Sequence, residues 1–358
     1  MRLRSLVARG YRNLADLERE APPRGVTLLG ANAQGKTNLL EAIYYPVLFR
    51  SFRGAPDQQV AAGTPGFHVE VGLDGAGAHT VATTYAARKK RITVDGGDIE
   101  RLTDAVGTWL SVAFLPSDLG LASGPAAGRR QYLDRLLSLA SRKYLRALTR
   151  YRGALAQRNS ALRQGRPDLA QAFDAPLVGS GAELVRTRLQ WVNGAAEQFA
   201  AELEWLGERG HARLQYLGGT ELAEDAAWGP ALAQALPEDR ARGTTTIGPH
   251  RDDLLLAIGN RRLRDYGSTG QQRSAAVAFK LIEISALSAT RGTEPALLLD
   301  DVFAELDRTR QTRLALRLLG PEHRQVFVSS PRMDELPPKL DLPVWVVEGG
   351  RIVDGSRV

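Results

Sequence analysis

The sequence of 358 residues contains no cysteine, which excludes disulfide-bonded scaffolds and metal sites built from thiolates. Its five histidines are dispersed without the spacing of metal ligands, so no zinc site is expected. No stretch is long and apolar enough to cross a bilayer, and Met1 to Arg4 lead into polar residues instead of the apolar core of a signal peptide. No internal repeat was found. We therefore expect a cytoplasmic protein with no membrane partner.

The sequence does contain an excess of cationic residues. Its 47 Lys and Arg exceed its 40 Asp and Glu, which gives a net charge of +7 and an isoelectric point of about 9.8. A basic protein of this size is attracted to polyanions, although a modest excess of charge also serves solubility. At roughly 100 to 200 residues per domain, the chain has room for two units with a core.

A glycine-rich segment carries the strongest chemical signal. It matches the spacing G-x-x-x-x-G-K-[ST] at every fixed position, with Gly30, Ala31, Asn32, Ala33, Gln34, Gly35, Lys36 and Thr37. A strand is predicted at 26–29 and a helix at 38–43, so that backbone N–H groups and a helix N-terminus face the phosphates. Lys36 is expected to reach the β- and γ-phosphates, and the Thr37 hydroxyl to ligate Mg²⁺. The sequence therefore predicts a nucleoside triphosphate site.

A second apolar strand, predicted at 296–299, ends in two acids. Asp300 is expected to hold Mg²⁺ through a water molecule. Asp301 is expected to orient or deprotonate the water that attacks the γ-phosphate. Lys36, Asp300 and Asp301 are therefore the predicted catalytic residues of an ATPase.

A third segment defines the subclass of ATPase. It resembles the S-x-G-Q signature of ABC-type ATPases, with Ser268, Thr269, Gly270 and Gln271 before a helix predicted at 273–286. In ABC-type ATPases the signature binds the γ-phosphate of ATP held by the opposite subunit, so two chains enclose two nucleotides. A segment after Asp301 resembles the D-loop that crosses this interface, with Ala304, Glu305, Leu306 and Asp307. Ser330 stands where transporters have a switch histidine, and Asp301 where they have a glutamate.

These departures and the remaining motifs resemble the RecF family of bacterial recombination-mediator ATPases. Matching blocks run through the chain at 10–14, 30–43, 50–53, 114–118, 124–134, 248–254 and 299–307. The resemblance implies that Arg12 approaches the nucleotide, with Asn38 following the phosphate-binding loop. It also implies a weak, DNA-stimulated ATPase that binds duplex DNA near single-strand/double-strand junctions at gaps. RecR and RecO are the implied partners, in loading RecA during repair.

The pattern of elements predicts an α/β protein with an ABC-type P-loop ATPase head of mixed β-sheets and helices, and an inserted α-helical lobe. Residues 1–117 and 238–358 are assigned to the head and 118–237 to the lobe. Apolar residues between Val185 and Leu206 repeat in steps of four and three, and a matching series begins at Tyr144. These two series predict a short antiparallel helical hairpin. Asp118, at the entrance to the lobe, is expected to couple the γ-phosphate to lobe movement, as the Q-loop does.

Much of the positive charge of the lobe lies in its first helical segment, since residues 129–166 contain eleven Lys or Arg and one acid, Asp134. Arg135, Arg142, Arg146 and Arg150 are spaced to share one face of a helix. Such a face suits a DNA backbone, and the predicted contacts are Arg129, Arg130, Arg135, Arg142, Lys143, Arg146 and Arg150. A solvated helix face remains the alternative, and the Ser138 to Ser141 stretch is a candidate helix break.

We predict a DNA-binding ATPase, similar to the heads of SMC proteins, in which ATP with Mg²⁺ closes a homodimer and hydrolysis releases it. One alternative is the nucleotide-binding subunit of a membrane transporter. That class predicts a histidine at position 330, a shorter insertion and no basic helix. Another alternative is a nuclease-coupled ATPase of the same superfamily, which would need an acid-rich metal domain that we do not expect after Val358.

Overall fold

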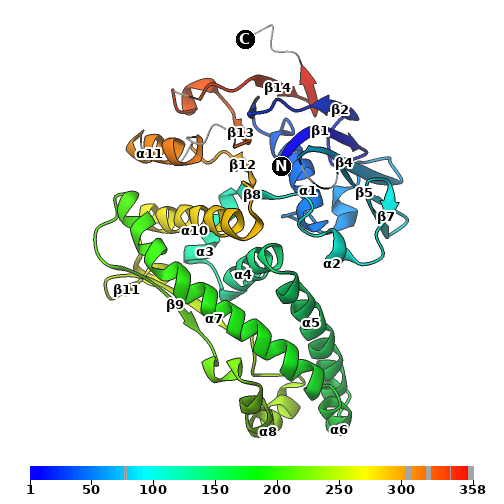
Figure 1. Cartoon of the computed structure of the whole chain (residues 1–358), viewed down its shortest axis with the longest axis vertical. Coiled ribbons are helices and arrows are strands. Elements are labelled where there is room, and N and C mark those ends of the chain that lie inside the picture. The colour runs from blue at the N-terminus through cyan, green and yellow to red at the C-terminus, as the bar shows by residue number, and fades with distance from the viewer. Residues whose placement is uncertain (76, 78, 304–307, 320–323, 339, 354–358) are drawn as a thin grey trace. The chain divides into compact units, whose positions relative to one another are not determined.

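The computed structural model describes residues 1–75, 77, 79–303, 308–319, 324–338 and 340–353 (Figure 1). The chain divides into two units, one of residues 1–117 and 284–358 and the other of residues 118–283. The sequence pattern instead predicts the second boundary at 237. The difference arises because β10 (Asp253–Ile258) pairs with β9 (Ala212–Leu217) in an antiparallel register, which keeps residues 238–283 with the helical lobe.

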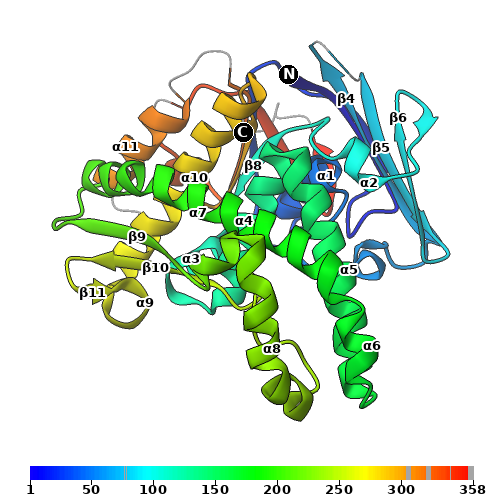
Figure 2. The same cartoon turned by 60° about the horizontal axis from the view of Figure 1, so that its bottom comes forward.

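The first unit contains an antiparallel sheet in the order β2-β1-β4-β5-β6-β7. Its strands are β1 (Arg2–Arg9), β2 (Leu17–Glu20), β4 (Gly66–Asp74), β5 (Thr80–Ala86), β6 (Lys89–Val94) and β7 (Gly97–Asp98). Strands β4, β5 and β6 lie side by side in Figure 2. The predicted hairpin at 92–97 is confirmed, with Asp95 at φ 50° and Gly96 at φ 77° in the turn between β6 and β7.

The second sheet of this unit has the order β15-β14-β3-β13-β12-β8, and all neighbours except β14 and β15 are parallel. Its strands are β3 (Gly25–Leu29), β8 (Ser111–Phe114), β12 (Ala296–Asp300), β13 (Val326–Ser330), β14 (Val344–Glu348) and β15 (Arg351–Val353). Strands β3, β12 and β13 are buried along their whole length, as their continuous apolar sequences suggest. Because parallel strands end at the same edge, Leu29, Asp300 and Ser330 share one edge of the sheet.

Helix α1 (Lys36–Leu48) contacts strands of both sheets in the first unit, and its side chains Leu39, Leu40 and Ile43 are buried. The smaller elements of this unit are η1 (Pro56–Gln59), α2 (Leu102–Ala105), α11 (Arg308–Leu319) and η4 (Met333–Glu335). Helix α1 thus forms the core of the unit while its first residues follow directly from the loop after β3.

The second unit is mainly helical. Its helices are α3 (Gly120–Ser123), α4 (Ala126–Ala140), α5 (Arg142–Arg163), α6 (Pro167–Gln171), α7 (Asp174–Trp205), α8 (Asp225–Arg242) and α9 (Leu263–Tyr266), with η3 (Thr220–Ala223) and β11 (Arg261–Arg262). The turn η2 (Pro116–Leu119) spans the first boundary, and α10 (Thr269–Arg291) spans the second. Among the helices in the described part of the chain, none could span a membrane.

The predicted helical hairpin is confirmed: α5 and α7 pack side by side and α6 lies in the connection between them (Figure 1). Tyr144, Leu148 and Tyr151 of α5 are buried, as their spacing predicted. Gly181 of α7 allows close packing, because an added Cβ would overlap the ring of Trp228. The hairpin is therefore a packed part of the lobe.

Buried ion pairs also hold the second unit together. The guanidinium of Arg188 lies 2.7 Å from Asp134 and 3.6 Å from Asp252, and it donates to the carbonyl oxygen of Pro249 at 2.6 Å. Arg158 pairs with Asp174 at 2.8 Å and with Asp239 at 2.6 Å. Since buried charges are costly without partners, these pairs fix the packing of α4, α5, α7 and α8.

Candidate functional site

The phosphate-binding loop joins β3 to α1. Gly35 adopts φ 109°, a conformation that favours glycine, and directly precedes Lys36 at the start of the helix. At Gly30 an added Cβ would overlap the carbonyl oxygen of Val347, so this position also requires glycine. The N-terminus of a helix of 13 residues therefore faces the loop and provides a partial positive charge for an anion.

The Lys36 side chain folds over this loop. Its ammonium donates to the carbonyl oxygens of Gly30 at 2.6 Å and Ala31 at 3.1 Å, and the residue is 5% exposed. Phosphate oxygens are stronger partners for an ammonium group than neutral carbonyls are. The arrangement thus suits a lysine that exchanges loop carbonyls for the phosphates of a nucleotide.

Thr37 and Asp300 meet at the end of the parallel sheet. The Thr37 hydroxyl donates to the two carboxylate oxygens of Asp300 at 2.9 and 3.0 Å. With its proton directed at Asp300, the hydroxyl keeps oxygen lone pairs for a cation. Within the described residues, no three His, Cys, Asp or Glu side chains gather into a metal cluster. The hydroxyl of Thr37 and the carboxylate of Asp300 fit Mg²⁺ because both offer oxygen atoms, and this ion is usually held by few protein oxygens together with substrate phosphates.

Asp301 adopts a left-handed backbone conformation, with φ 50°. Its N–H donates to the hydroxyl of Ser329 at 3.0 Å, and the same hydroxyl lies 3.3 Å from its carboxylate. Burial and the neighbouring charge of Asp300 raise the pKa of the Asp301 carboxyl above its ordinary value. A carboxylate with a raised pKa is a stronger base for the proton of an attacking water molecule.

The serine that contacts both acids is Ser329. Ser330, at the predicted switch position, donates its hydroxyl to the carbonyl oxygen of Arg332 at 2.8 Å. Ser329 is opposite Asp300 in the parallel pairing of β12 and β13. This register could have revealed Ser329, because side chains on adjacent paired positions point to the same side of a sheet.

Arg12 is anchored next to the start of α1. Its guanidinium forms two hydrogen bonds with the buried carboxylate of Glu41, at 2.8 and 3.0 Å, and donates to the carbonyl oxygens of Gln58 and Arg53. The adjacent Asn13 donates to the carbonyl oxygen of Ala33 in the phosphate-binding loop at 3.4 Å. The segment that carries Arg12 is thus hydrogen-bonded to the phosphate-binding loop through Asn13, while the guanidinium of Arg12 itself pairs with Glu41.

The phosphate-binding loop is also held in place by a turn near the C-terminal end of the described residues. The turn between β14 and β15 donates two backbone N–H groups to Gln34, from Gly349 to the side chain at 2.6 Å and from Gly350 to the carbonyl oxygen at 2.9 Å. Sequence reasoning missed this support, since no motif links position 34 to the last strands.

The signature segment forms the start of α10. Ser268 accepts a hydrogen bond from the Gln271 N–H at 3.2 Å, and the Gln271 side chain accepts one from the Ser268 N–H at 3.0 Å. This reciprocal capping orders the helix N-terminus, with Thr269 and Gly270 in its first turn. The D-loop residues, Ala304 to Asp307, lie outside the described residues.

Asp118 is held at the entrance to the helical unit. Its carboxylate pairs at 3.3 Å with the buried ammonium of Lys280, which also lies 3.4 Å from Glu283. Asp118 therefore has a strong electrostatic link to α10, the helix that the signature begins.

The predicted DNA-contacting cations fall into two groups. Arg142, Lys143, Arg146 and Arg150 are exposed on α5, whereas Arg130 is half-buried and donates to the carbonyl oxygen of Asp252. Arg129 is buried in a pair with Asp253 at 2.6 Å, and Arg135 pairs with Glu283 at 2.8 Å. These two guanidinium groups form ion pairs with acids of the same unit, which corrects the expectation that they face a DNA backbone.

The break in the helix explains part of this correction. Helix α4 ends at Ala140, and the Ser141 hydroxyl accepts a hydrogen bond from the Tyr144 N–H at the start of α5. Arg135 therefore belongs to a different helix from Arg142, Arg146 and Arg150, and the four do not form one continuous face.

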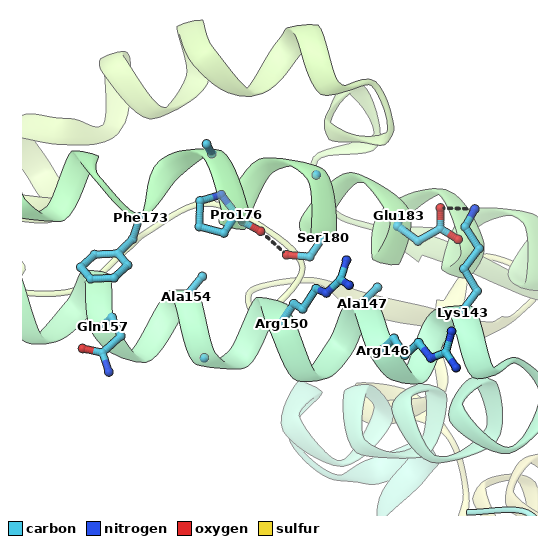
Figure 3. Close-up of a pocket in the computed structure, with 13 residues that line it drawn as sticks. Lys143, Arg146, Ala147, Arg150, Ala154, Gln157, Phe173, Pro176, Ser180 and Glu183 are labelled. Atoms are coloured by element: carbon cyan, nitrogen blue, oxygen red, sulfur yellow. Dashed lines mark hydrogen bonds and ion pairs between the residues drawn. The ribbon is translucent and has the colours of Figure 1, made fainter. Parts of the chain in front are cut away.

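The exposed cations border a groove of about 770 Å³ between α5 and α7 (Figure 3). The side of α5 contributes Lys143, Arg146 and Arg150, and the side of α7 is formed mainly by small residues around Pro176 and Gly179. Lys143 pairs with Glu183 at 2.7 Å across the groove. The arrangement presents a row of positive charge along α5.

No protein-family model matches the chain. Among curated proteins, it is 38% identical over 367 residues to the DNA replication and repair protein RecF of Anaeromyxobacter sp. strain Fw109-5, covering 98% of this chain and 99% of that protein. Among solved structures, the recombination mediator protein RecF with ATP, of the RecFOR pathway, has a TM-score of 0.89 and 28% identity. That match covers 98% of this chain and 96% of the other.

A more distant structural relative is an Smc head bound to the C-winged helix domain of ScpA, with a TM-score of 0.56 and 15% identity over 99% of this chain and 97% of the other. At this identity the likeness concerns the fold alone. Together these likenesses confirm the predicted fold, an ABC-type ATPase head of mixed sheets and helices with an inserted helical lobe.

Proposed function

This chain belongs to the RecF family of DNA replication and repair proteins, and we propose that it is an ATP-dependent DNA-binding protein of recombinational repair. One observation carries the proposal: the phosphate-binding loop and the strand-end acids meet through the Thr37–Asp300 hydrogen bond. The similar RecF structure with ATP supports ATP as the nucleotide. The transporter and nuclease-coupled alternatives are set aside, because the family match extends over almost the whole chain.

In the proposed ATPase reaction, the loop N–H groups and Lys36 hold the phosphates of ATP. Thr37 and Asp300 would hold Mg²⁺, which neutralises charge on the β- and γ-phosphates when it is bound. Asp301 accepts a proton from a water molecule whose oxygen forms the new bond to the γ-phosphorus, while the bond from that phosphorus to the ADP oxygen breaks. The products are ADP and phosphate. We expect weak hydrolysis that DNA accelerates.

We further propose that ATP links two copies of the chain. In this mechanism Ser268, Thr269, Gly270 and Gln271 of one copy contact the γ-phosphate of ATP bound to the other. The capped start of α10 supports this role, because the cap holds in place a helix N-terminus, whose partial positive charge favours an anion. Hydrolysis removes the γ-phosphate and thereby opens the dimer.

Duplex DNA is the proposed polyanionic partner of the helical unit. Arg142, Lys143, Arg146 and Arg150 form its proposed contact surface, supported by their exposure along one helix. Such a row binds phosphates without reading bases, which suits a protein that recognises a structure such as a single-strand/double-strand junction.

We propose RecO and RecR as partners, in the loading of RecA at gaps. The similar RecF structure is described as a mediator of the RecFOR pathway, which supports this choice.

Light scattering of the full chain tests the proposal. The mass should double with ATP and Mg²⁺ but remain that of a monomer with ADP, and duplex DNA should favour the dimer. Lys36→Met is the matched control, because it should remain a monomer in every condition. A wild-type mass that is the same with ATP and with ADP would contradict the proposed mechanism.

A further inference from the structure

Ser329 lies at the end of β13, is 1% exposed, and contacts both acids of the ATPase site. We propose that Ser329 is a positioning residue for ATP hydrolysis, whose hydroxyl joins Asp300 to the backbone of Asp301 and thereby fixes the direction of the Asp301 carboxylate. This inference rests on the proposed ATPase function and assigns a role to a side chain outside the recognised motifs.

The hydroxyl of Ser329 both donates and accepts a hydrogen bond in this arrangement. It donates to an oxygen of Asp300 at 2.8 Å and accepts the N–H of Asp301 at 3.0 Å. The same Asp300 oxygen also accepts the Thr37 hydroxyl at 2.9 Å. Because a hydroxyl has one proton and two lone pairs, Ser329 can bridge the two acids in this way without leaving its own proton unpaired. The bridge links Asp301 to the part of the site that would hold the cation.

Asp301 needs such an anchor because of its backbone. A left-handed conformation is unfavourable for a residue with a side chain, although aspartate tolerates it better than most. Asp301 follows the last residue of β12, so its N–H is bound by the Ser329 hydroxyl instead of a neighbouring strand. Loss of this hydroxyl would remove the restraint on φ, and the Asp301 carboxylate would no longer have one defined direction.

Ser111 of β8 provides a matched control in the same parallel sheet. Ser111 is 1% exposed, and its hydroxyl has no hydrogen-bond partner among the described residues. It is opposite Ala296, at the other end of β12 from Asp300. Ser329→Ala and Ser111→Ala therefore each remove a buried serine hydroxyl from the sheet, and only the first change removes the hydrogen bonds to Asp300 and Asp301.

The test compares kcat for ATP hydrolysis, the Kd of ATP and unfolding by urea in the full-length variants. Ser329→Ala should lower kcat roughly 10- to 100-fold, the scale of loss for a displaced reacting group, while Kd changes by less than about threefold. Ser329→Cys keeps a side chain of similar size but donates hydrogen bonds weakly, so it should lose activity without opening a cavity. Ser329→Thr keeps the hydroxyl and should restore most of kcat.

The control Ser111→Ala should keep kcat and Kd within about threefold of the wild type. The inference is overturned if Ser329→Ala and Ser329→Cys retain wild-type kcat, or if both serine-to-alanine variants lose kcat equally. It is also overturned if Ser329→Thr is as inactive as Ser329→Ala although both fold. If the wild type itself fails to hydrolyse ATP, the proposed function fails, which is a different outcome.

Discussion

The carboxylate of Asp300 accepts a hydrogen bond from the hydroxyl of Thr37 at 2.9 Å, although 263 positions separate the two residues in the sequence. Parallel pairing brings them together, because β13 pairs with β12 on one side and with β3 on the other. The loop that follows β3 and the acids that end β12 therefore form one site within one unit of the chain. The proposed binding and hydrolysis of ATP depend on this contact.

Lys36→Met should abolish nucleotide binding. The ammonium is nearly buried above the loop, and its loss leaves phosphate charge without a partner at a cost of several kcal/mol. Equilibrium titration with a fluorescent ATP analogue measures the effect, and circular dichroism should show that the variant remains folded. Retained micromolar affinity would contradict the assignment of the phosphate-binding loop.

Replacing Arg142, Arg146 and Arg150 together with glutamine should weaken duplex binding without changing ATP affinity. The slope of log binding constant against log salt should fall by about 0.9 for each DNA phosphate that the variant no longer neutralises. A control that replaces Arg163, Arg240 and Arg242 changes the net charge equally on other exposed positions of the same unit. If the slope is unchanged in the first variant, the row on α5 is a solvated face and DNA binds elsewhere.

Asp301→Asn should separate ATP binding from hydrolysis. The amide cannot accept the proton of the attacking water, while Asp300 and Thr37 keep their hydrogen bond, so turnover should fall roughly a hundredfold or more. The ATP-bound dimer should then persist, and the variant should stay on duplex DNA longer than the wild type. Measured lifetimes equal to those of the wild type would show that Asp301 does not control release.

His250→Gln should make the protein less sensitive to acid. The Nε2 of His250 donates to the carbonyl oxygen of Thr245 at 2.9 Å and Nδ1 accepts from Tyr151 at 2.6 Å, which fixes the neutral form. Burial, and then the charges of nearby arginines, lower its pKa from 6.5 to about 4. Between pH 6.5 and about pH 4, His250 binds more protons in the unfolded chain than in the folded chain. Acidification over this range therefore lowers the free energy of unfolding.

The titration of Asp252 has the opposite effect on the free energy of unfolding over much of the same pH range. Burial raises its pKa from 3.8 to about 6, so the folded chain binds more protons there and acidification stabilises it. Glutamine removes only the contribution of His250. Urea unfolding at pH 7 and pH 5 should therefore show a smaller loss of stability in His250→Gln than in the wild type. Equal losses would show that His250 does not titrate with the shifted pKa.

The sequence predicted what depends on local spacing. The phosphate-binding loop, the 92–97 hairpin and the helical hairpin were found because their signals lie within a few turns or strands of chain. Ser329 was missed because its role depends on the register between β12 and β13, which no local pattern defines.

The pairing of Arg129 and Arg135 with acids could not be predicted for a similar reason. Their acidic partners, Asp253 and Glu283, lie 124 and 148 positions away in the sequence. A run of cations has the same appearance in a sequence whether its members face solvent or distant acids. Spacing alone therefore grouped Arg135 with Arg142, although a capped break separates their helices.

The most direct test of the central claim mixes two defective chains, Ser268→Arg and Lys36→Met. The first should bind ATP yet remain a monomer, because the added side chain occupies the space for the partner's nucleotide. The second should bind no ATP. In the mixture one intact phosphate-binding loop can face one intact signature, so light scattering with ATP and Mg²⁺ should detect a dimer that neither variant forms alone. Dimerisation of Ser268→Arg by itself, or a mixture that remains monomeric, would contradict the account.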